Sequence, residues 1–180
     1  MDIGTGTGRA VLRRARRDPG ALVIGVDAEA SAMAEASRSA AASTRKGGQP
    51  NALFLVESAE RLPGPLAGRA DLVTVILPWG SLLRGVLDAD AQIVSGLKEM
   101  LRPGGELCLM LSDIDAAQVD RLVVAYRPVG FEKLACDPAN EADVAALSSG
   151  WARRLGIPGS RPAWMIRLRR FDRVRGARGS

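Results

Sequence analysis

A glycine-rich loop near the start of the chain has the composition of a loop that holds a nucleoside-type cofactor. Gly4, Gly6 and Gly8 alternate with threonines just before a run of helix-forming residues. Because glycine has no Cβ atom, the backbone N–H groups of such a loop can approach a ligand closely. Asp27 follows 19 residues after Gly8, at the end of the next apolar run. A carboxylate there can accept both hydroxyls of a ribose, although the glycines alone are also compatible with a tight structural turn.

The residue that leads this loop distinguishes two cofactors. NAD sites typically carry Gly-x-Gly-x-x-Gly, with the pyrophosphate on the start of the helix. Sites for S-adenosyl-L-methionine (SAM) typically have an acid before Gly-x-Gly-x-Gly, and Asp2 supplies it here. Residues 58–63 (SAERLP) follow an expected strand, where they would bracket an adenine, and residues 102–105 (RPGG) form a turn common in class I methyltransferases. The pattern favours SAM.

Two tryptophans accompany these motifs. Trp79 follows the expected end of a strand in LPWGSLL, and Trp151 lies in SSGWARRL. If both rings converge near the methyl donor, they can hold a flipped base between them, and stacking is worth about 1–3 kcal/mol per base. For either residue alone, packing in the core is the alternative. Trp164 is expected to pack in the last strand.

The elements that must position these residues alternate between short apolar runs and helix-type runs. Strands are expected at residues 22–27, 52–56, 71–77, 106–111, 131–136 and 163–171. Helices are expected directly after the glycine loop and at residues 29–43, 91–101, 115–126 and 141–155. Apolar strands separated by helices indicate a sheet buried on both faces. We therefore expect an α/β, doubly wound, Rossmann-like fold with its ligand crevice at the carboxyl ends of the strands.

Composition limits the chemistry further. The 180 residues suffice for one domain, expected over residues 1–172, with a disordered basic tail at 173–180. The chain has no histidine, which excludes Ser-His and Cys-His pairs, a His general base and His-containing zinc sites. Cys108 and Cys136 are too few for a disulfide framework or a four-thiolate metal site, so we expect core cysteines and no metal. Without a spanning run or a signal sequence, the cytoplasm is the expected compartment and no membrane is expected as a partner.

Positive charge is concentrated at the carboxyl end. The net charge is +5, and residues 151–180 contain nine arginines and one acid, which gives this segment a net charge of +8. A second cluster consists of Arg9, Arg13, Arg14, Arg16 and Arg17. Such asymmetry points to a polyanionic partner, and a general preference for arginine with a frayed tail is the alternative.

Several motifs together resemble a known enzyme family. They are DIGTG at 2–6, RKGGQPN at 45–51, SAERLP at 58–63, LPWGSLLRGVL at 77–87 and S-x-W-x-R-R-L at 149–155. In combination they are similar to the aminoglycoside-resistance methyltransferases that modify N1 of an adenosine in the decoding site of 16S rRNA, the kanamycin–apramycin resistance (Kam) family. The resemblance runs through most of the chain. It implies a class I SAM-dependent methyltransferase with a mostly parallel seven-stranded sheet. Because Met1 directly precedes Asp2, we expect either that the first strand is truncated or that the true start lies upstream of Met1.

The resemblance also implies roles for individual residues. Trp79 and Trp151 would clamp the flipped adenine, and Ser149 would support the target region. The SAM-binding residues would be Asp2, Gly4, Thr5, Gly6, Asp27, Ala59, Glu60, Leu77 and Ser81. The RNA-binding residues would be Arg45, Lys46, Arg153, Arg154 and Arg161. Adenine N1 has an available lone pair, so the enzyme would supply proximity and orientation rather than a base.

The implied activity is that of a 16S rRNA (adenine(1408)-N(1))-methyltransferase that acts on the 30S ribosomal subunit as a monomer, releases S-adenosyl-L-homocysteine and confers aminoglycoside resistance. Two alternatives stay open. One is a methyltransferase for another RNA or a small molecule. The other is a SAM-fold homologue that binds the 30S subunit with weak or no methylation.

Overall fold

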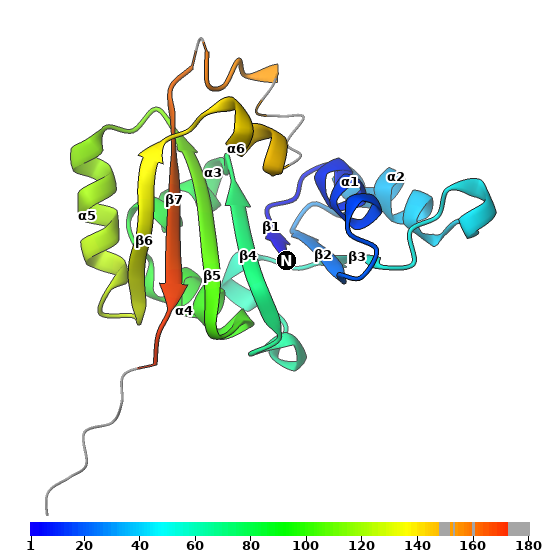
Figure 1. Ribbon diagram of the computed structural model, residues 1–180. Helices are drawn as coiled ribbons and strands as arrows, with labels where there is room; N and C mark the ends of the chain where they lie inside the picture. Colours follow the sequence, from blue (N-terminus) through cyan, green and yellow to red (C-terminus); the bar gives the residue numbers. More distant parts are fainter. Residues whose placement is uncertain (148–151, 153, 160, 173–180) are drawn as a thin grey trace, which may run out of the picture.

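A seven-stranded sheet organises the molecule (Figure 1). The structure is a computed structural model that describes residues 1–147, 152, 154–159 and 161–172. The strands are β1 (Asp2–Ile3), β2 (Val23–Asp27), β3 (Ala52–Val56), β4 (Ala70–Ile76), β5 (Leu101–Ser112), β6 (Phe131–Pro138) and β7 (Ala163–Arg170). Their order is β3-β2-β1-β4-β5-β7-β6, with β7 antiparallel to its neighbours and the other pairs parallel. The expected doubly wound, mostly parallel fold is confirmed.

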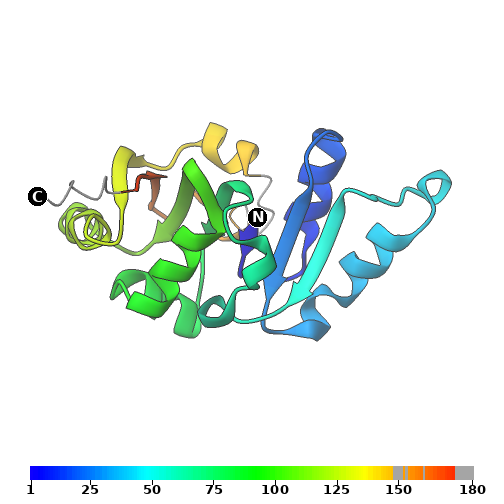
Figure 2. The same cartoon turned by 90° about the horizontal axis from the view of Figure 1, so that it is seen from below.

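Helices cover the sheet on both sides. They are α1 (Arg9–Arg17), α2 (Ala30–Ala41), α3 (Gly80–Leu87), α4 (Ala91–Met100), α5 (Ala116–Tyr126) and α6 (Glu141–Ala146). Short 3-10 turns lie at Thr44–Lys46, Ala59–Arg61 and Gly64–Leu66. Figure 2 shows α4 and α6 on opposite sides of the sheet, and Figure 1 shows α5 beside β6. In the described part of the chain, none of the helices has the length and apolar character needed to cross a membrane.

The core explains why the strands are apolar throughout. Residues 107–111 of β5 are all at most 7% exposed, although their side chains point alternately to the two faces. Leu107, Leu109 and Leu111 pack in the cluster that includes α4 and α5, whereas Cys108 and Met110 pack with α6. A sheet buried on both faces therefore has no polar alternation. Cys136 is half-buried.

Strand β1 is short and central. It has two residues, and Asp2 pairs with Gly25 of β2 on one side and Thr74 of β4 on the other. The Thr74 N–H donates a hydrogen bond to the Met1 carbonyl at 2.8 Å. With these two residues, β1 delivers the glycine loop to the carboxyl edge of the sheet.

Some boundaries differ from the expectations. Helix α3 has no counterpart among the helices expected from the sequence. Of the helix expected at 141–155, the structure describes α6 at Glu141–Ala146 and helical residues Ala152 and Arg154, with residues outside the described part of the chain between them. The turn at 102–105 lies within β5, as an irregularity between the pairs Ala70–Leu101 and Leu72–Glu106. The tail at 173–180 lies outside the described residues.

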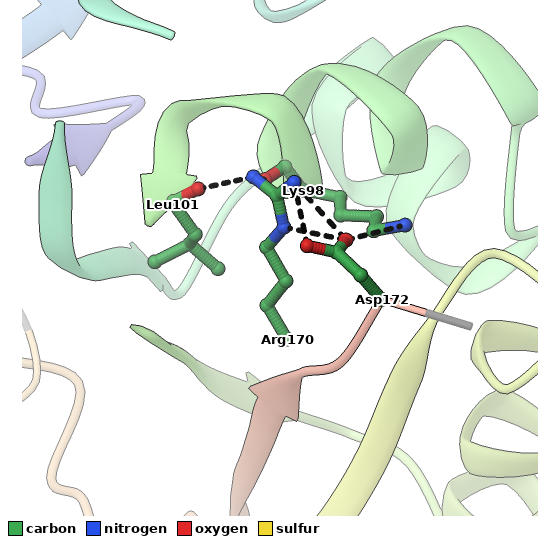
Figure 3. Close-up of polar contacts among 4 residues, drawn as sticks. All are labelled: Lys98, Leu101, Arg170 and Asp172. Atoms are coloured by element: carbon green, nitrogen blue, oxygen red, sulfur yellow. Dashed lines mark hydrogen bonds and ion pairs between the residues drawn. The ribbon is translucent and has the colours of Figure 1, made fainter. Parts of the chain in front are cut away.

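An arginine at the end of β7 fastens the sheet to α4 (Figure 3). The Arg170 guanidinium donates to the carbonyls of Lys98 and Leu101 at the carboxyl end of α4. It also donates to the Asp172 carboxylate at 3.1–3.3 Å, and Lys98 Nζ lies 3.6 Å from the same carboxylate. A cation at this end of a helix satisfies carbonyls that have no intrahelical partner. This contact stabilises the fold, because it joins the end of β7 to the end of α4.

Candidate functional site

The glycine loop is held by the end of β2. Gly4 and Thr5 donate their N–H groups to the Val26 carbonyl at 2.8 and 3.1 Å. The Gly6 N–H donates to Asp27 Oδ2 at 2.7 Å, and the Glu29 N–H donates to Asp27 Oδ1 at 2.9 Å. One carboxylate thus fixes both the loop and the start of the segment that leads to α2. The arrangement joins the two sequence signals that pointed to a nucleoside-type cofactor.

Glycine stands at positions 6 and 8 of the loop for different structural reasons. Gly8 has φ +68°, and a Cβ there would lie 2.4 Å from Cε1 of Phe54 and 2.8 Å from Cβ of Ala36. Gly6 has φ +56°, but nothing lies within 4 Å of the position of its Cβ. Packing therefore requires glycine at position 8, whereas Gly6 combines a left-handed backbone with open space in front of the loop. That space is where a ligand can approach the backbone.

Polar groups lie beneath the loop. The Thr74 hydroxyl donates to Asp2 Oδ1 at 2.6 Å. Burial raises the pKa of the Asp2 carboxyl above its ordinary value, and the Thr74 hydrogen bond opposes that shift. The Thr5 hydroxyl lies close enough to act on Asp2 in the same direction, but its buried Oγ1 makes no hydrogen bond of ordinary geometry within the described structure. A buried hydroxyl of this kind is suited to a polar ligand group.

A cavity of about 500 Å³ opens at this edge of the sheet. Its lining includes six of the predicted site residues that the structure describes: Asp2, Gly4, Thr5, Gly6, Leu77 and Trp79 of the SAM and target groups. Arg154 of the predicted RNA-binding group lines it as well. A larger cavity of about 620 Å³ lies between the first residues of β2 and β4 and shares only Asp2 with the predicted site. The smaller cavity is therefore the candidate site, because ligands of doubly wound sheets bind at the carboxyl ends of the strands.

Trp79 is the most exposed large apolar residue of this region. It immediately precedes α3, and 84% of its surface is accessible. The core alternative is wrong for Trp79, whereas Trp164 is half-buried in β7 and packs against the main core cluster, as expected. An aromatic ring held at the mouth of a cavity offers a face for a planar ligand group.

Leu77 lines the cavity, whereas the other four predicted SAM residues are absent from its lining. Leu77 is buried with φ +50°, and its N–H donates to the Met110 carbonyl at 2.8 Å. Ala59 is buried in the core cluster, which leaves its backbone for a ligand, and Glu60 is half-exposed after β3. Ser81 is exposed in the first turn of α3. The structure does not place Asp27, Ala59, Glu60 or Ser81 in the cavity lining.

The predicted RNA-binding residues are divided. Arg45 and Lys46 are exposed in the 3-10 turn after α2. Arg161 forms an ion pair with Asp113, to which its Nε donates at 3.1 and 3.2 Å. Ser149, Trp151 and Arg153 lie outside the described residues.

Sequence reasoning missed some members of the cavity. Arg9, Arg13 and Arg14 of α1 line it, together with Thr74 and Ile76 of β4. These three arginines belong to a charge cluster that the sequence shows, but nothing in their spacing placed them beside the glycine loop. Thr74 lies within an apolar strand, and only the register of β1 against β4 reveals that it faces Asp2.

These residues fit SAM. The open space at Gly6, the unpaired Thr5 hydroxyl, the Asp2 carboxylate and the strand-end carboxylate of Asp27 match a ligand with an amino acid end and a ribose. A cavity of about 500 Å³ is within the usual range for small-molecule sites. The fold and this site together define a class I SAM-dependent methyltransferase.

Comparison with known proteins identifies the family. The family model NpmA, 16S rRNA (adenine(1408)-N(1))-methyltransferase, matches residues 1–119. A protein of that description from Streptoalloteichus tenebrarius is 37% identical over 172 residues, covering 86% of this chain and 79% of its own. The chain therefore belongs to the NpmA family of 16S rRNA (adenine(1408)-N(1))-methyltransferases.

Solved structures agree with this assignment. A variant of the 16S rRNA (adenine(1408)-N(1))-methyltransferase from Catenulisporales acidiphilia, crystallised with its cosubstrate SAM, superposes with a TM-score of 0.85. It is 30% identical, and the match covers 96% of this chain and 85% of that one. The 16S rRNA methyltransferase KamB superposes with a TM-score of 0.83 at 32% identity, covering 95% and 86% of the two chains. The expected resemblance is confirmed.

Proposed function

We propose that this chain transfers the methyl group of SAM to N1 of adenine 1408 in 16S rRNA and so confers aminoglycoside resistance. The observation that carries the proposal is the shared cavity of the glycine loop and the exposed Trp79, in a chain that belongs to this family. A SAM loop alone would serve many substrates. An unpacked tryptophan at the mouth of the same cavity favours a planar base as the methyl acceptor.

The residues of the loop bind and orient the cofactor. Asp27 is positioned to accept the ribose hydroxyls, since its carboxylate already lies at the carboxyl end of β2. Asp2, with Thr74 behind it, presents a carboxyl group to the amino acid end of the cofactor. When bound, SAM supplies a sulfonium methyl group that a nitrogen lone pair can displace.

The chemistry needs no proton transfer at the acceptor. Neutral adenine carries a lone pair on N1, so a bond from N1 to the methyl carbon forms as the bond from sulfur to that carbon breaks. The positive charge moves from sulfur to the adenine ring, and S-adenosyl-L-homocysteine leaves. A chain without histidine is adequate for this reaction, because positioning the two reactants supplies much of the rate.

Trp79 has two roles in this mechanism. Its exposed ring stacks on the flipped base and holds N1 toward the methyl group. The same ring face attracts the positive charge that develops on the adenine during transfer, as in other cation–π contacts. Trp151 and Ser149 complete the clamp in this proposal, and Arg45, Lys46, Arg153, Arg154 and Arg161 contact the rRNA backbone.

The experiment is methyl transfer with separated ribosomal subunits. Purified protein and radiolabelled SAM are incubated with 30S subunits, and 50S subunits serve as the control. Label in 16S rRNA of the 30S subunit alone supports the proposal. Label in both subunits would favour another RNA methyltransferase, and no label at saturating SAM would favour a binding protein. We further propose that the protein acts in the cytoplasm and that its active species is a monomer. Light scattering of the complex with 30S subunits would test whether one copy is bound.

A further inference from the structure

We propose that the arginines of α1 that line the cavity, Arg9, Arg13 and Arg14, bind backbone phosphates of the rRNA beside the target nucleotide. This inference deepens the proposed function and rests on it. It concerns a surface of α1, whereas the RNA-binding residues implied by the sequence resemblance lie after α2 and between β6 and β7. These three residues are the α1 arginines.

The first support is where the α1 arginines lie. They form one wall of the cavity of about 500 Å³, and Arg154, which is distant in sequence, lines it too. The glycine loop and Trp79 line the same space. A base stacked on Trp79 therefore brings its own sugar–phosphate backbone to the mouth of a cavity that carries guanidinium groups.

The charge of the cavity supports an anionic ligand. Four arginines line it, and among the described lining residues Asp2 contributes the one carboxylate. That carboxylate accepts a hydrogen bond from Thr74, and its single negative charge leaves the four-arginine lining with a net positive charge. Guanidinium groups are suited to phosphate because their N–H donors match its oxygens in pairs.

Arginines at positions 9 and 13 do not stabilise α1 through the helix dipole or through their mutual spacing. The first turn of α1 contains no acid, and Gly8 at its amino end provides no side-chain cap. A cation in the first turn opposes the helix dipole, and like charges four residues apart, as in Arg9 and Arg13, are destabilising. The pairing of Arg9 with Glu35 at 3.7 Å joins two exposed side chains and is worth little.

Arg16 and Arg17 on the same helix have a structural explanation. Both lie in the last turn, as Arg14 also does, and cations there favour the helix dipole. Arg17 also donates to the carbonyls of Ala145 and Ala146 at the end of α6, at 3.3 and 2.5 Å. Neither residue lines the cavity. The helix therefore contains both the test residues and a matched control, Arg16, which is exposed.

The test measures binding of 30S subunits as a function of salt for the full chain and for Arg9→Ala, Arg13→Ala and the control Arg16→Ala. Loss of one phosphate contact is expected to weaken affinity about 3–10-fold at about 100 mM KCl and to reduce the slope of log K against log salt by about 0.7–0.9. Arg16→Ala is expected to stay within about twofold. Circular dichroism checks that each variant is folded, and calorimetry measures SAM affinity.

Each other result contradicts the proposal in a distinct way. Equal losses in Arg9→Ala and Arg16→Ala would mean a general charge effect rather than a site. A loss of SAM affinity equal to the loss of 30S affinity would mean that the α1 arginines bind the carboxylate of SAM. Binding of 30S subunits without methyl transfer would overturn the proposed function and leave the salt series able to test the α1 arginines. No binding of 30S subunits by the unsubstituted chain would overturn both.

Discussion

The Gly6 N–H donates a hydrogen bond to Asp27 Oδ2 at 2.7 Å, which joins the glycine loop after β1 to the end of β2. The two residues lie 21 positions apart in the sequence, and β1, which leads into the loop, pairs directly with β2 in parallel. Because the same carboxylate also accepts the Glu29 N–H, its position is fixed without the cofactor. A prearranged carboxylate reduces the ordering that SAM binding must impose.

Replacement of Asp27 should weaken SAM binding. Asp27→Ala removes the acceptor of two backbone N–H groups and the predicted partner of the ribose, so we expect at least a tenfold loss of SAM affinity by calorimetry. The free energy of unfolding should fall by about 1–2 kcal/mol, as for other lost hydrogen bonds. Asp27→Asn keeps one oxygen acceptor and should lose less stability than Asp27→Ala. SAM affinity within twofold of the unsubstituted chain in Asp27→Ala would refute this role.

Replacement of Trp79 should separate activity from stability. Its side chain is 84% exposed, so Trp79→Ala should change the free energy of unfolding by less than about 0.5 kcal/mol. Loss of one stacking contact of about 1–3 kcal/mol should lower kcat/KM for 30S subunits by about 5–150-fold. Trp79→Phe retains a ring and should recover much of the rate. If Trp79→Ala methylated 30S subunits at the normal rate, the base-stacking role would be wrong.

Replacement of Arg170 should lower the stability of the protein. Its side chain is 18% exposed and donates to two carbonyls at the end of α4 (Figure 3). Arg170→Ala leaves those carbonyls without this donor and should lower the free energy of unfolding by about 1–3 kcal/mol in urea titrations. The neighbouring Arg169 is 46% exposed and lies 3.6 Å from Glu132, so Arg169→Ala is the matched control and should cost less than about 1 kcal/mol. Equal losses in the two variants would contradict the capping role.

The two cysteines should react in a fixed order. Burial raises the pKa of the Cys108 thiol to about 11, and it also raises the pKa of Cys136, whose side chain is only half-buried. At pH 8, iodoacetamide should therefore modify Cys136 first, and Cys108 only at the rate of unfolding, as read by mass spectrometry. The pKa shift of Cys108 also affects stability. Above pH 9 the unfolded thiol ionises before the folded one, so its contribution to stability is lost as pH rises from 9 toward 11. Faster labelling of Cys108 than of Cys136 in the folded protein would contradict the burial.

Much of the fold could be predicted from the sequence because local signals agree with the tertiary structure. The apolar runs became strands since both faces of the sheet are covered, as the burial of residues 107–111 shows. Gly8 and Asp27 stand where packing and loop geometry require them. The ends of the helices and strands were predicted less well. Helix α3 begins directly after Trp79, in a motif whose proline and glycine argue against a helix.

The site was predictable only where chain-local motifs define it. Asp2 and Trp79 belong to such motifs and do line one cavity. The α1 arginines and Thr74 enter the cavity through strand register and helix orientation, which depend on contacts between residues far apart in sequence. Arg161 illustrates the same limit, since its partner Asp113 lies 48 positions away.

The central claim is that one adenosine of 16S rRNA is methylated at N1. Reverse transcription through the decoding site tests it most directly, because a methyl group on N1 blocks the base-pairing edge that the polymerase reads. 30S subunits treated with the protein and SAM should give a strong stop next to adenine 1408, which is absent without SAM and much reduced with Trp79→Ala. Full-length transcripts from subunits treated at saturating SAM would contradict the account.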